Sequence, residues 1–288
     1  MPFLKKGSSL DESVESYSII ALGVEYKGTN YHGFQRQKLG VATVQSELEL
    51  ALKKVSGGEN FSLICAGRTD AAVHASGQVV HFKTKVQRSE RSWVMGSNSY
   101  LPADISVTWA KKMPDHFNAR FCAYARRYRY VIYNDSIRPA HMADQVSWSY
   151  RTLDILKMRQ AIPYFLGQHD FSAFRARHCQ AKSPIKTIHH IHLLQYGHLI
   201  VLDIRANAFL HHMVRNIAGV LMAIGKGEYP IEWAKEVLDN KKRCTGGVTA
   251  TPGGLYLIKV DYPEEFDLPK RYLGPHFLSG LPDVANKL

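Results

Sequence analysis

The alternation of apolar and polar positions predicts six secondary-structure elements in the first half of the chain. Apolar side chains occupy every second position from Ile20 to Tyr26, the pattern of a strand with one buried face. Apolar residues recur at helical spacing from 44 to 55, where Thr43 can cap the start and Gly57 can end the helix. In chain order, we expect a strand at 18–26, a helix at 44–55, strands at 61–65 and 77–82, a helix at 90–101 and a strand at 105–111.

The same order of elements returns in the second half. Pro163 is expected to kink or shorten the first helix there, because proline removes a backbone donor from a helix interior. Apart from one added helix, each half reads β-α-β-β-α-β, the order of a ferredoxin-like unit. Strands are predicted at 126–133, 187–195, 199–205 and 255–261, and helices at 153–166, 209–224 and, as the addition, 233–238.

We therefore predict an α+β fold made of two ferredoxin-like subdomains. The repeat rests on the pattern of elements, since identity between the two halves is not evident. The predicted organisation is an N-terminal tail at 1–16, a first subdomain at 17–115, a second subdomain at 116–262 and a C-terminal arm at 263–288.

The charge balance is strongly positive and indicates a polyanionic partner. The 288 residues include 37 lysines and arginines against 25 aspartates and glutamates, a formal net charge of +12. Such an excess favours nucleic acid first and an anionic membrane surface second. The 45% hydrophobic content is enough for a sizeable core and excludes a generally disordered chain. The 15 tyrosines and 12 phenylalanines can supply stacking surfaces among the basic groups.

Cysteine spacing and apolar content indicate a soluble cytoplasmic protein that does not enter a membrane. The longest apolar run, at 217–225, is far shorter than the ~18 residues that a membrane span requires. The first 16 residues contain no apolar segment typical of a signal peptide. The cysteines form no CxxC pair, so neither a zinc knuckle nor a disulfide framework is expected. We predict four buried, reduced thiols, at Cys65, Cys122, Cys179 and Cys244.

The segment at 66–75, AGRTDAAVHA, carries the strongest candidate chemistry. It places Asp70 between Arg68 and His74 in a loop that joins two predicted strands. A carboxylate held in such a loop suits a reaction that needs an ionised acid as nucleophile or base. The alternative is a polar turn in which the aspartate caps the local backbone.

Other segments combine with this loop into one ordered series of motifs. They are YKGTNYHGFQ at 26–35, GQVVHF at 77–82, ARRYRY at 125–130, FSAFRA at 171–176, FLHHMVRN at 209–216 and GGLY at 253–256. The series resembles the tRNA pseudouridine synthase A family along nearly the whole chain. One residue departs from it, because Ala72 stands where the family has glycine. A positive φ there would strain alanine, but the small side chain predicts that the change is tolerated.

The resemblance implies an isomerase that converts uridine into pseudouridine in tRNA. Its expected targets are the uridines at tRNA positions 38, 39 and 40 in the anticodon stem-loop, bound by a homodimer. The reaction breaks the bond between C1′ and N1 and joins C1′ to C5, so we expect no cofactor and no metal. A uridine within a stem must be flipped out to reach Asp70. The implied fold has two α+β subdomains whose sheets join, with a catalytic cleft between them.

The resemblance also assigns roles to two charged side chains. Asp70 matches the catalytic aspartate, which can attack the sugar, attack the base or take a proton. Arg215 matches the basic residue that pairs with that carboxylate, and its guanidinium would keep the acid ionised. Without the resemblance, Arg215 would be an ordinary solvated charge on the predicted helix at 209–224.

Basic and aromatic residues alternate along the predicted strand at 126–133. Tyr128 matches the tyrosine that stacks on the target uracil, a contact worth ~1–3 kcal/mol. Arg126 shares its face, while Arg127 and Arg129 point the other way. Such interleaving suits RNA, with rings on bases and guanidiniums on phosphates. Tyr130, on the Tyr128 face, is more simply explained as a residue that covers the core.

Two further residues are expected to bind the substrate. Arg68 can contact the vacated base stack or a phosphate, with a local salt bridge as the alternative. His211 precedes Arg215 by four residues, so both can share a helix face with His212. Two adjacent histidines can also ligate a metal, but the HExxH pattern is absent, and a core or phosphate contact is the preferred interpretation.

Two other functions compete with an isomerase. A non-catalytic RNA-binding module explains the charge and the aromatics equally well, but it leaves a carboxylate facing phosphates that would repel it. A hydrolase that cleaves a base or sugar through Asp70 normally needs a second carboxylate as acid. None lies near Asp70 in the sequence.

Overall fold

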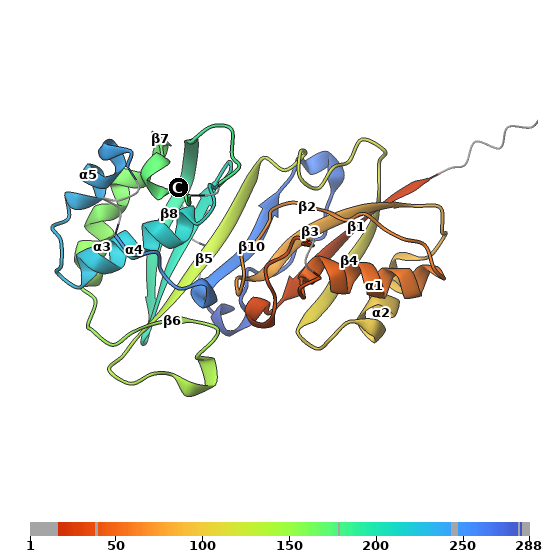
Figure 1. Ribbon diagram of the computed structural model, residues 1–288, viewed down its shortest axis with the longest axis horizontal. Coiled ribbons are helices and arrows are strands. Elements are labelled where there is room, and N and C mark those ends of the chain that lie inside the picture. Colours follow the sequence, from red (N-terminus) through yellow and green to blue (C-terminus); the bar gives the residue numbers. More distant parts are fainter. Residues whose placement is uncertain (1–16, 38–39, 178, 243–246, 282, 284–288) are drawn as a thin grey trace, which may run out of the picture.

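Strands from both halves of the chain form one sheet, which has ten strands in the part of the chain that is described (Figure 1). The computed structural model describes residues 17–37, 40–177, 179–242, 247–281 and 283. The first half supplies β1 (Ser18–Tyr26), α1 (Val44–Ser56), β2 (Ile64–Cys65), β3 (His74–Thr84), α2 (Glu90–Tyr100) and β4 (Ile105–Met113). The second half supplies β5 (Ala125–Asn134), β6 (Ser147–Ser149), α3 (Ile155–Ala161), β7 (Gly167–Asp170), β8 (Ile185–Tyr196), β9 (Leu199–Ala206), α4 (Met213–Gly225), α5 (Trp233–Asn240) and β10 (Leu255–Asp261).

Each half has the strand order of a ferredoxin-like unit. The sheet runs β4-β1-β3-β10-β5-β9-β8-β7 from edge to edge, with β2 paired to β3 and β6 paired to β5. The first unit therefore reads β4-β1-β3-β2 and the second reads β10-β5-β9-β8, which is the same order within each unit. The predicted α+β class, with two ferredoxin-like units whose sheets join, is confirmed.

The two units join where β3 and β10 run side by side in the same direction. His74 and Ala75, at the start of β3, pair with Tyr256 and Leu257 of β10. Because β3 begins at His74, the preceding loop is held at the junction of the two units. That loop carries Asp70.

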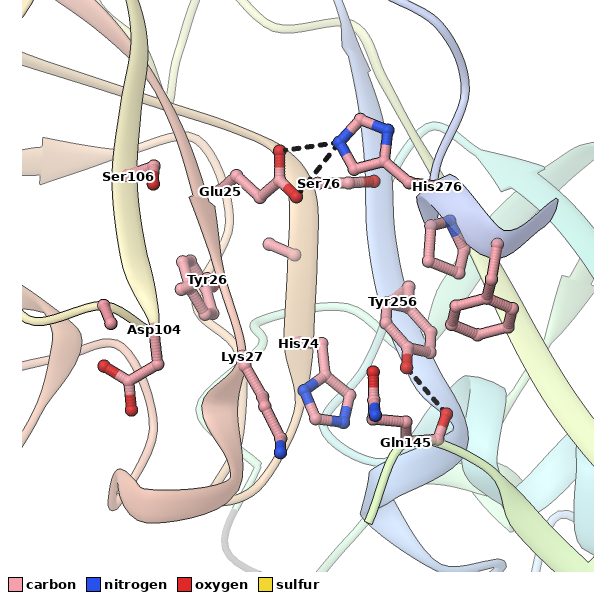
Figure 2. A pocket seen from close by; sticks show the side chains of 14 residues that line it. Glu25, Tyr26, Lys27, His74, Ser76, Asp104, Ser106, Gln145, Tyr256 and His276 are labelled. Carbon is pink, nitrogen blue, oxygen red and sulfur yellow. Dashed lines mark hydrogen bonds and ion pairs between the residues drawn. The ribbon is translucent and has the colours of Figure 1, made fainter. Parts of the chain in front are cut away.

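His74 is a structural residue that holds the two units together at this junction. Its Nδ1 accepts a hydrogen bond from the Gly28 N–H at 2.9 Å, which leaves the proton on Nε2. Nε2 lies 3.1 Å from the carbonyl oxygens of Asp144 and Gly253. The ring stacks on Tyr256 with centroids 4.7 Å apart, beside a hollow of ≈ 240 Å³ (Figure 2). Burial lowers the pKa of His74, so the neutral ring bridges the two units at neutral pH.

The helices cover one face of the sheet, and loops with the C-terminal segment cover the other (Figure 1). Strand β1 shows how the sequence alternation produces these layers. Ile20, Leu22 and Val24 belong to the main core beneath the helices. Ile19 and Ala21 point the opposite way, into a smaller cluster. That cluster also contains Met113, Phe117 and Phe266, and a third cluster joins Val131 and Val201 to Leu278.

Local signals set the ends of two helices as expected. Thr43 and Ser46 form a reciprocal capping box at the start of α1, and Gly57 ends it in a left-handed conformation with φ 83°. Helix α3 stops at Ala161, where a 3₁₀ turn over Ile162–Phe165 begins and contains Pro163. The predicted shortening by proline is therefore confirmed.

Three predicted elements are wrong at their starts, and the strand expected at 77–82 begins three residues earlier, at His74. The strand expected at 61–65 forms only over Ile64–Cys65, because the Leu63 N–H donates to Glu49 of α1 at 3.4 Å instead of to a strand. The helix expected at 209–224 begins at Met213. His212 has φ 63°, a left-handed conformation that an α-helix cannot contain, so the residues before it lie outside the helix.

The sheet face away from the helices buries a cluster of ionised groups. Asp203 of β9 is wholly buried and lies 2.6 Å from Nε of Arg127 and 3.0 Å from Nε of Arg129. Both arginines are at most 2% exposed, so the prediction that the guanidiniums of this strand contact phosphates is wrong for them. The C-terminal segment completes the cluster, because Asp283 lies 2.8 Å from Arg127 and the Gly274 carbonyl accepts from Arg129 at 3.1 Å.

The thiols differ from the prediction in their burial. Cys65 is buried, whereas Cys122 and Cys179 are partly exposed. Both exposed sulfurs accept backbone hydrogen bonds, Cys122 from Asn118 at 3.2 Å and Cys179 from His211 at 3.3 Å, which holds them in loops. Cys244 lies outside the described residues. Across the described chain, every helix is too short or too polar to cross a bilayer.

Candidate active site

A cleft of ≈ 1120 Å³ is lined by residues of both units. The first unit contributes the loop between β2 and β3, and the second contributes β5 and the segment that leads into α4. Among the described residues that line the cleft, Asp70 is the only acidic side chain. Four arginines line it as well: Arg68, Arg120, Arg126 and Arg215.

The backbone around Asp70 is fixed by the segment that follows β1. The Thr69 carbonyl accepts from the Phe34 N–H at 3.0 Å, and the Tyr31 carbonyl accepts from the Ala72 N–H at 3.2 Å. Gly33 allows this approach, because a Cβ at its position would lie 2.7 Å from the Thr69 oxygen. This packing explains why the motif at 26–35 accompanies the Asp70 loop in the sequence.

Ala72 adopts the conformation for which glycine is better suited. Its φ is 59°, in the left-handed region, so the sequence concern about this position is correct. The small methyl group is accommodated, and the loop closes with the Val73 N–H donating to the Asp70 carbonyl at 3.1 Å.

Replacing Ala72 by glycine is expected to stabilise the fold. Holding alanine in the left-handed conformation costs about 1–2 kcal/mol of folding free energy, and glycine avoids this cost. The greater freedom of glycine in the unfolded chain takes back about 0.5–1 kcal/mol of that gain in stability. Denaturant unfolding should therefore show Ala72→Gly more stable by about 0.5–1 kcal/mol. Ala71→Gly, at a position without a positive φ, is the matched control and should be destabilised. Equal destabilisation of both variants would contradict the strain argument.

The Asp70 carboxylate reaches across the cleft to basic groups of the second unit. Its Oδ1 lies 3.0 Å from Nε2 of His211, and its Oδ2 lies 3.5 Å from Nε2 of His212. Oδ2 also lies 3.9 Å from a terminal nitrogen of Arg215, whose Nε donates to the Ala250 carbonyl at 2.8 Å. The side chain is 26% exposed, so the acid contacts basic side chains and is still open to the cleft. These contacts take the place of the backbone cap considered as the alternative.

The two histidines reach Asp70 by a route that the sequence did not predict. We expected them on one face of a helix with Arg215, but α4 starts after them. Successive side chains diverge by about 100° in a helix and by about 180° in a strand. The left-handed φ of His212 gives the backbone a turn that belongs to neither a helix nor a strand. This turn lets both imidazoles face the Asp70 carboxylate.

Tyr128 lies at the bottom of the cleft and Tyr130 lies in the core. The Tyr128 ring is buried and contacts Phe209 edge to face, with centroids 5.1 Å apart. Burial raises the pKa of Tyr128, and the nearby negative charge of Asp70 raises it too, so the phenol stays protonated at neutral pH. Tyr130 is fully buried and donates to the Thr251 carbonyl at 2.8 Å, as expected of a core residue.

Arg126 lines the cleft but is engaged with the backbone. It donates to the Ala66 carbonyl at 2.8 Å and to the Arg120 carbonyl at 2.8 Å. It also donates to the carbonyls of Ala123 and Asn207, at 2.9 and 3.3 Å. The guanidinium therefore ties the start of the Asp70 loop to the second unit, which gives it a positioning role besides any contact with RNA.

Several exposed residues line the cleft, among them Arg68, Arg120 and Phe121. Arg68 was predicted to bind the substrate, whereas the sequence did not single out Arg120 and Phe121. Arg68 is exposed, and its guanidinium contacts Gln180 of the second unit at 3.4 Å rather than a carboxylate. Phe121 is 78% exposed, and the Arg120 guanidinium lies 5.5 Å from its ring centre. An exposed aromatic beside an arginine suits a nucleic-acid base. No periodic signal marks residues 120 and 121, because they lie in a loop.

One group of side chains at the cleft has the composition of a metal site. The ligand atoms of Asp70, His211 and His212 all lie within 4.8 Å of one another. Arg215 lies against the same carboxylate at 3.9 Å, and its fixed positive charge opposes a bound cation. The arrangement therefore suits an ionised acid held by basic groups better than a metal centre.

The fold and the cleft define a class of RNA-modifying enzyme, and a family model identifies it. The model described as tRNA pseudouridine synthase matches residues 23–122 and 161–263, which include the Asp70 loop and the segment that leads into α4. The chain belongs to this family, and the resemblance seen in its motifs is confirmed.

Similar proteins carry a more specific name than the family model does. The chain is 66% identical to tRNA pseudouridine synthase A of Pseudomonas aeruginosa, over 96% of this chain and 97% of the relative. It is 53% identical to the protein of the same name from Alcanivorax borkumensis, over 90% and 97% of the two chains. The relative from Vibrio vulnificus, also named tRNA pseudouridine synthase A, is 53% identical over 93% and 99%.

Proposed function

We propose that this protein isomerises uridine to pseudouridine in tRNA, with Asp70 as the nucleophile. One observation carries the proposal: a single carboxylate from one unit faces three basic side chains of the other within the cleft. The Arg215 guanidinium supplies a fixed positive charge beside this carboxylate, and the ionised carboxylate is the reactive form. Membership in the tRNA pseudouridine synthase family supports the same chemistry.

In the proposed reaction, Asp70 attacks the uridine and the bond between N1 and C1′ breaks. The uracil then turns within the cleft, C5 bonds to C1′, and the C5 proton leaves while N1 gains one. Arg215 balances the carboxylate charge before attack and after its release. All atoms of uridine other than the exchanged proton are retained, so the step needs no oxidant or reductant.

The proposed substrate is the anticodon stem-loop of tRNA, at positions 38, 39 and 40. The four arginines of the cleft suit a phosphate backbone, and the exposed Phe121 ring suits an unstacked base. A stem uridine reaches Asp70 only after flipping out, and Arg68, which is exposed, can then contact the vacated stack or a nearby phosphate. The relatives' name, tRNA pseudouridine synthase A, supports tRNA as the substrate.

The test is the fate of uridine in tRNA incubated with the purified protein. With tritium at uracil C5, an isomerase releases tritium and yields pseudouridine at the three stem-loop positions. Free uracil would instead indicate a hydrolase, and binding without any product would indicate an RNA-binding module. The hydrolase is disfavoured beforehand, because the described residues of the cleft supply one carboxylate and not two.

A homodimer acting in the cytoplasm is part of this proposal. A stem-loop is held between two subunits in the arrangement that the family resemblance implies, and tRNA is a cytoplasmic substrate. Light scattering should give a mass near twice the 32.5 kDa of one chain. A monomer that retains full activity would contradict the dimer.

Substitution of Tyr128 should separate stacking from the hydroxyl. Tyr128→Phe should keep near-normal activity, because among the described residues the hydroxyl has no hydrogen-bond partner. Tyr128→Ala should weaken capture of the flipped base by ~1–3 kcal/mol, or roughly 5–150-fold in the half-saturating concentration of tRNA. Single-turnover rates against protein concentration measure both. Identical curves for Tyr128→Ala and the wild type would contradict the stacking role.

A further inference from the structure

We propose that His211 is the base that removes the C5 proton in the last step of isomerisation. This inference rests on the proposed function and adds a second catalytic residue to it. After C1′ has joined C5, that carbon still carries its hydrogen, and pseudouridine forms only when a base takes the proton. The cleft must therefore hold a proton acceptor in addition to the nucleophile.

The position of His211 fits this role. Its side chain is 38% exposed, lines the cleft and lies 3.0 Å from the Asp70 carboxylate. The ring contacts that of His212 with centroids 4.1 Å apart, and its backbone N–H is held by the Cys179 sulfur at 3.3 Å. Because Asp70 and the C5 atom react at the same nucleotide, a base that contacts Asp70 lies beside the reacting atoms.

The charge on Asp70 also sets which ring nitrogen is available. An ionised carboxylate only accepts hydrogen bonds, so the Nε2 atom of His211 that faces it carries the ring proton. Nδ1 of the neutral imidazole is then the acceptor. When it takes the C5 proton, the bonding pair forms the C5–C6 double bond and N1 takes a proton from solvent. The resulting imidazolium is stabilised by Asp70, which is a free carboxylate again, and later loses its proton to water.

The neighbouring groups are less suited to this step. Arg215 has no acceptor and stays charged. The Tyr128 phenol is kept protonated by burial. The Nε2 atom of His212 lies 3.5 Å from Oδ2 of Asp70, a longer distance than that of His211. The backbone of His212 is also strained, since its φ is 63°. The left-handed turn at His212 costs about 1–2 kcal/mol, and strain of this kind is retained where it positions functional groups, here the two imidazoles.

The experiment compares three histidine-to-glutamine variants with the wild type in single turnover on tRNA carrying hydrogen or deuterium at uracil C5. His211→Gln keeps an N–H donor for Asp70 but removes the basic nitrogen that can take a proton. It should slow product formation by about 10²-fold or more and show a larger deuterium isotope effect than the wild type, because C5–H cleavage becomes rate-limiting. His212→Gln should lower the rate without changing the isotope effect. His198→Gln, at an exposed hairpin site paired with Asp135 outside the cleft, should change neither.

A second measurement keeps the test informative if glutamine distorts the loop. Added imidazole should restore part of the activity of His211→Ala but none of the activity of Asp70→Asn. The inference is overturned if His211→Gln reacts within threefold of the wild type. It is also overturned if His211→Gln and His212→Gln lose rate equally with unchanged isotope effects, since both would then only position Asp70. A wild-type protein that makes no pseudouridine would instead refute the proposed function.

Discussion

Asp70→Asn is expected to lower the rate of pseudouridine formation by about 10³-fold or more while tRNA binding is kept. The amide has nearly the shape of the carboxylate but neither its charge nor its nucleophilicity. Binding should stay equal or become slightly tighter, because the change removes the negative charge that the described cleft residues present to RNA phosphates. Tritium release from uracil C5 in single turnover and filter binding of the same tRNA measure the two quantities.

The matched control is Asp239→Asn on the exposed end of α5. Asp239 forms a surface ion pair with Lys235 at 2.8 Å, so its loss should change neither rate nor binding. A variant Asp70→Asn that turns over near the wild-type rate would end the case for this residue as nucleophile. Loss of binding together with activity would point to a structural role for the acid instead.

Asp203→Asn is expected to lower the free energy of unfolding by about 3–5 kcal/mol. The substitution leaves Arg127 and Arg129 buried without the carboxylate that both contact. Burial by itself would raise the pKa of Asp203, but contacts with His190 and the two guanidiniums lower it well below its usual range. Urea unfolding at neutral pH measures the loss, and Asp239→Asn serves again as control, with an expected effect below about 0.5 kcal/mol.

The same cluster gives the wild type a defined acid sensitivity. A carboxyl whose pKa is lower in the folded than in the unfolded state contributes stability above its unfolded pKa, near 4. That contribution is lost progressively as the pH falls below about 4. Asp203→Asn should therefore flatten the decline in stability below pH 4. A parallel decline in variant and wild type would show that Asp203 does not carry this dependence.

The sequence predicted those elements whose ends are set by neighbouring residues, such as a helix cap, a terminal glycine or flanking polar residues. Strands β1 and β10 have the predicted bounds, Ser18–Tyr26 and Leu255–Asp261, because alternation and flanking polar residues define them. Helix α1 follows its Thr43 cap and its terminal glycine. The repeated order of elements was enough to predict two ferredoxin-like units, since that order is a property of the chain and not of its packing.

Other features of the fold depend on tertiary contacts and could not be predicted from the sequence. The short strand β7 pairs with one edge of β8 without an apolar alternation of its own, so no pattern marked it. Arg127 and Arg129 read as exposed cations until Asp203, from another strand, is placed beside them. The start of α4 depends on the left-handed conformation of His212, which apolar periodicity cannot reveal.

The candidate site was predictable in its residues and not in its geometry. Asp70 stood out in its loop, and Arg215 was assigned to it only through the family resemblance. Three of the predicted residues, Asp70, His211 and Arg215, do meet across the cleft. The contact of His211 with Asp70, rather than with a phosphate or the core, follows from a turn that a helical interpretation of the segment had excluded.

The parallel pairing of β3 with β10 has a consequence for how the two walls of the cleft behave. One wall precedes β3 and the other is carried by strands and helices of the second unit, so both are anchored in the same hydrogen-bonded sheet. Spreading them apart would tear backbone pairing at the junction. Under the proposed function, the adjustment on docking would therefore fall on the RNA, which would have to unpair and bend to bring its nucleotide to Asp70. The proposed stem-loop substrates would then be selected by how easily they deform as much as by their bases.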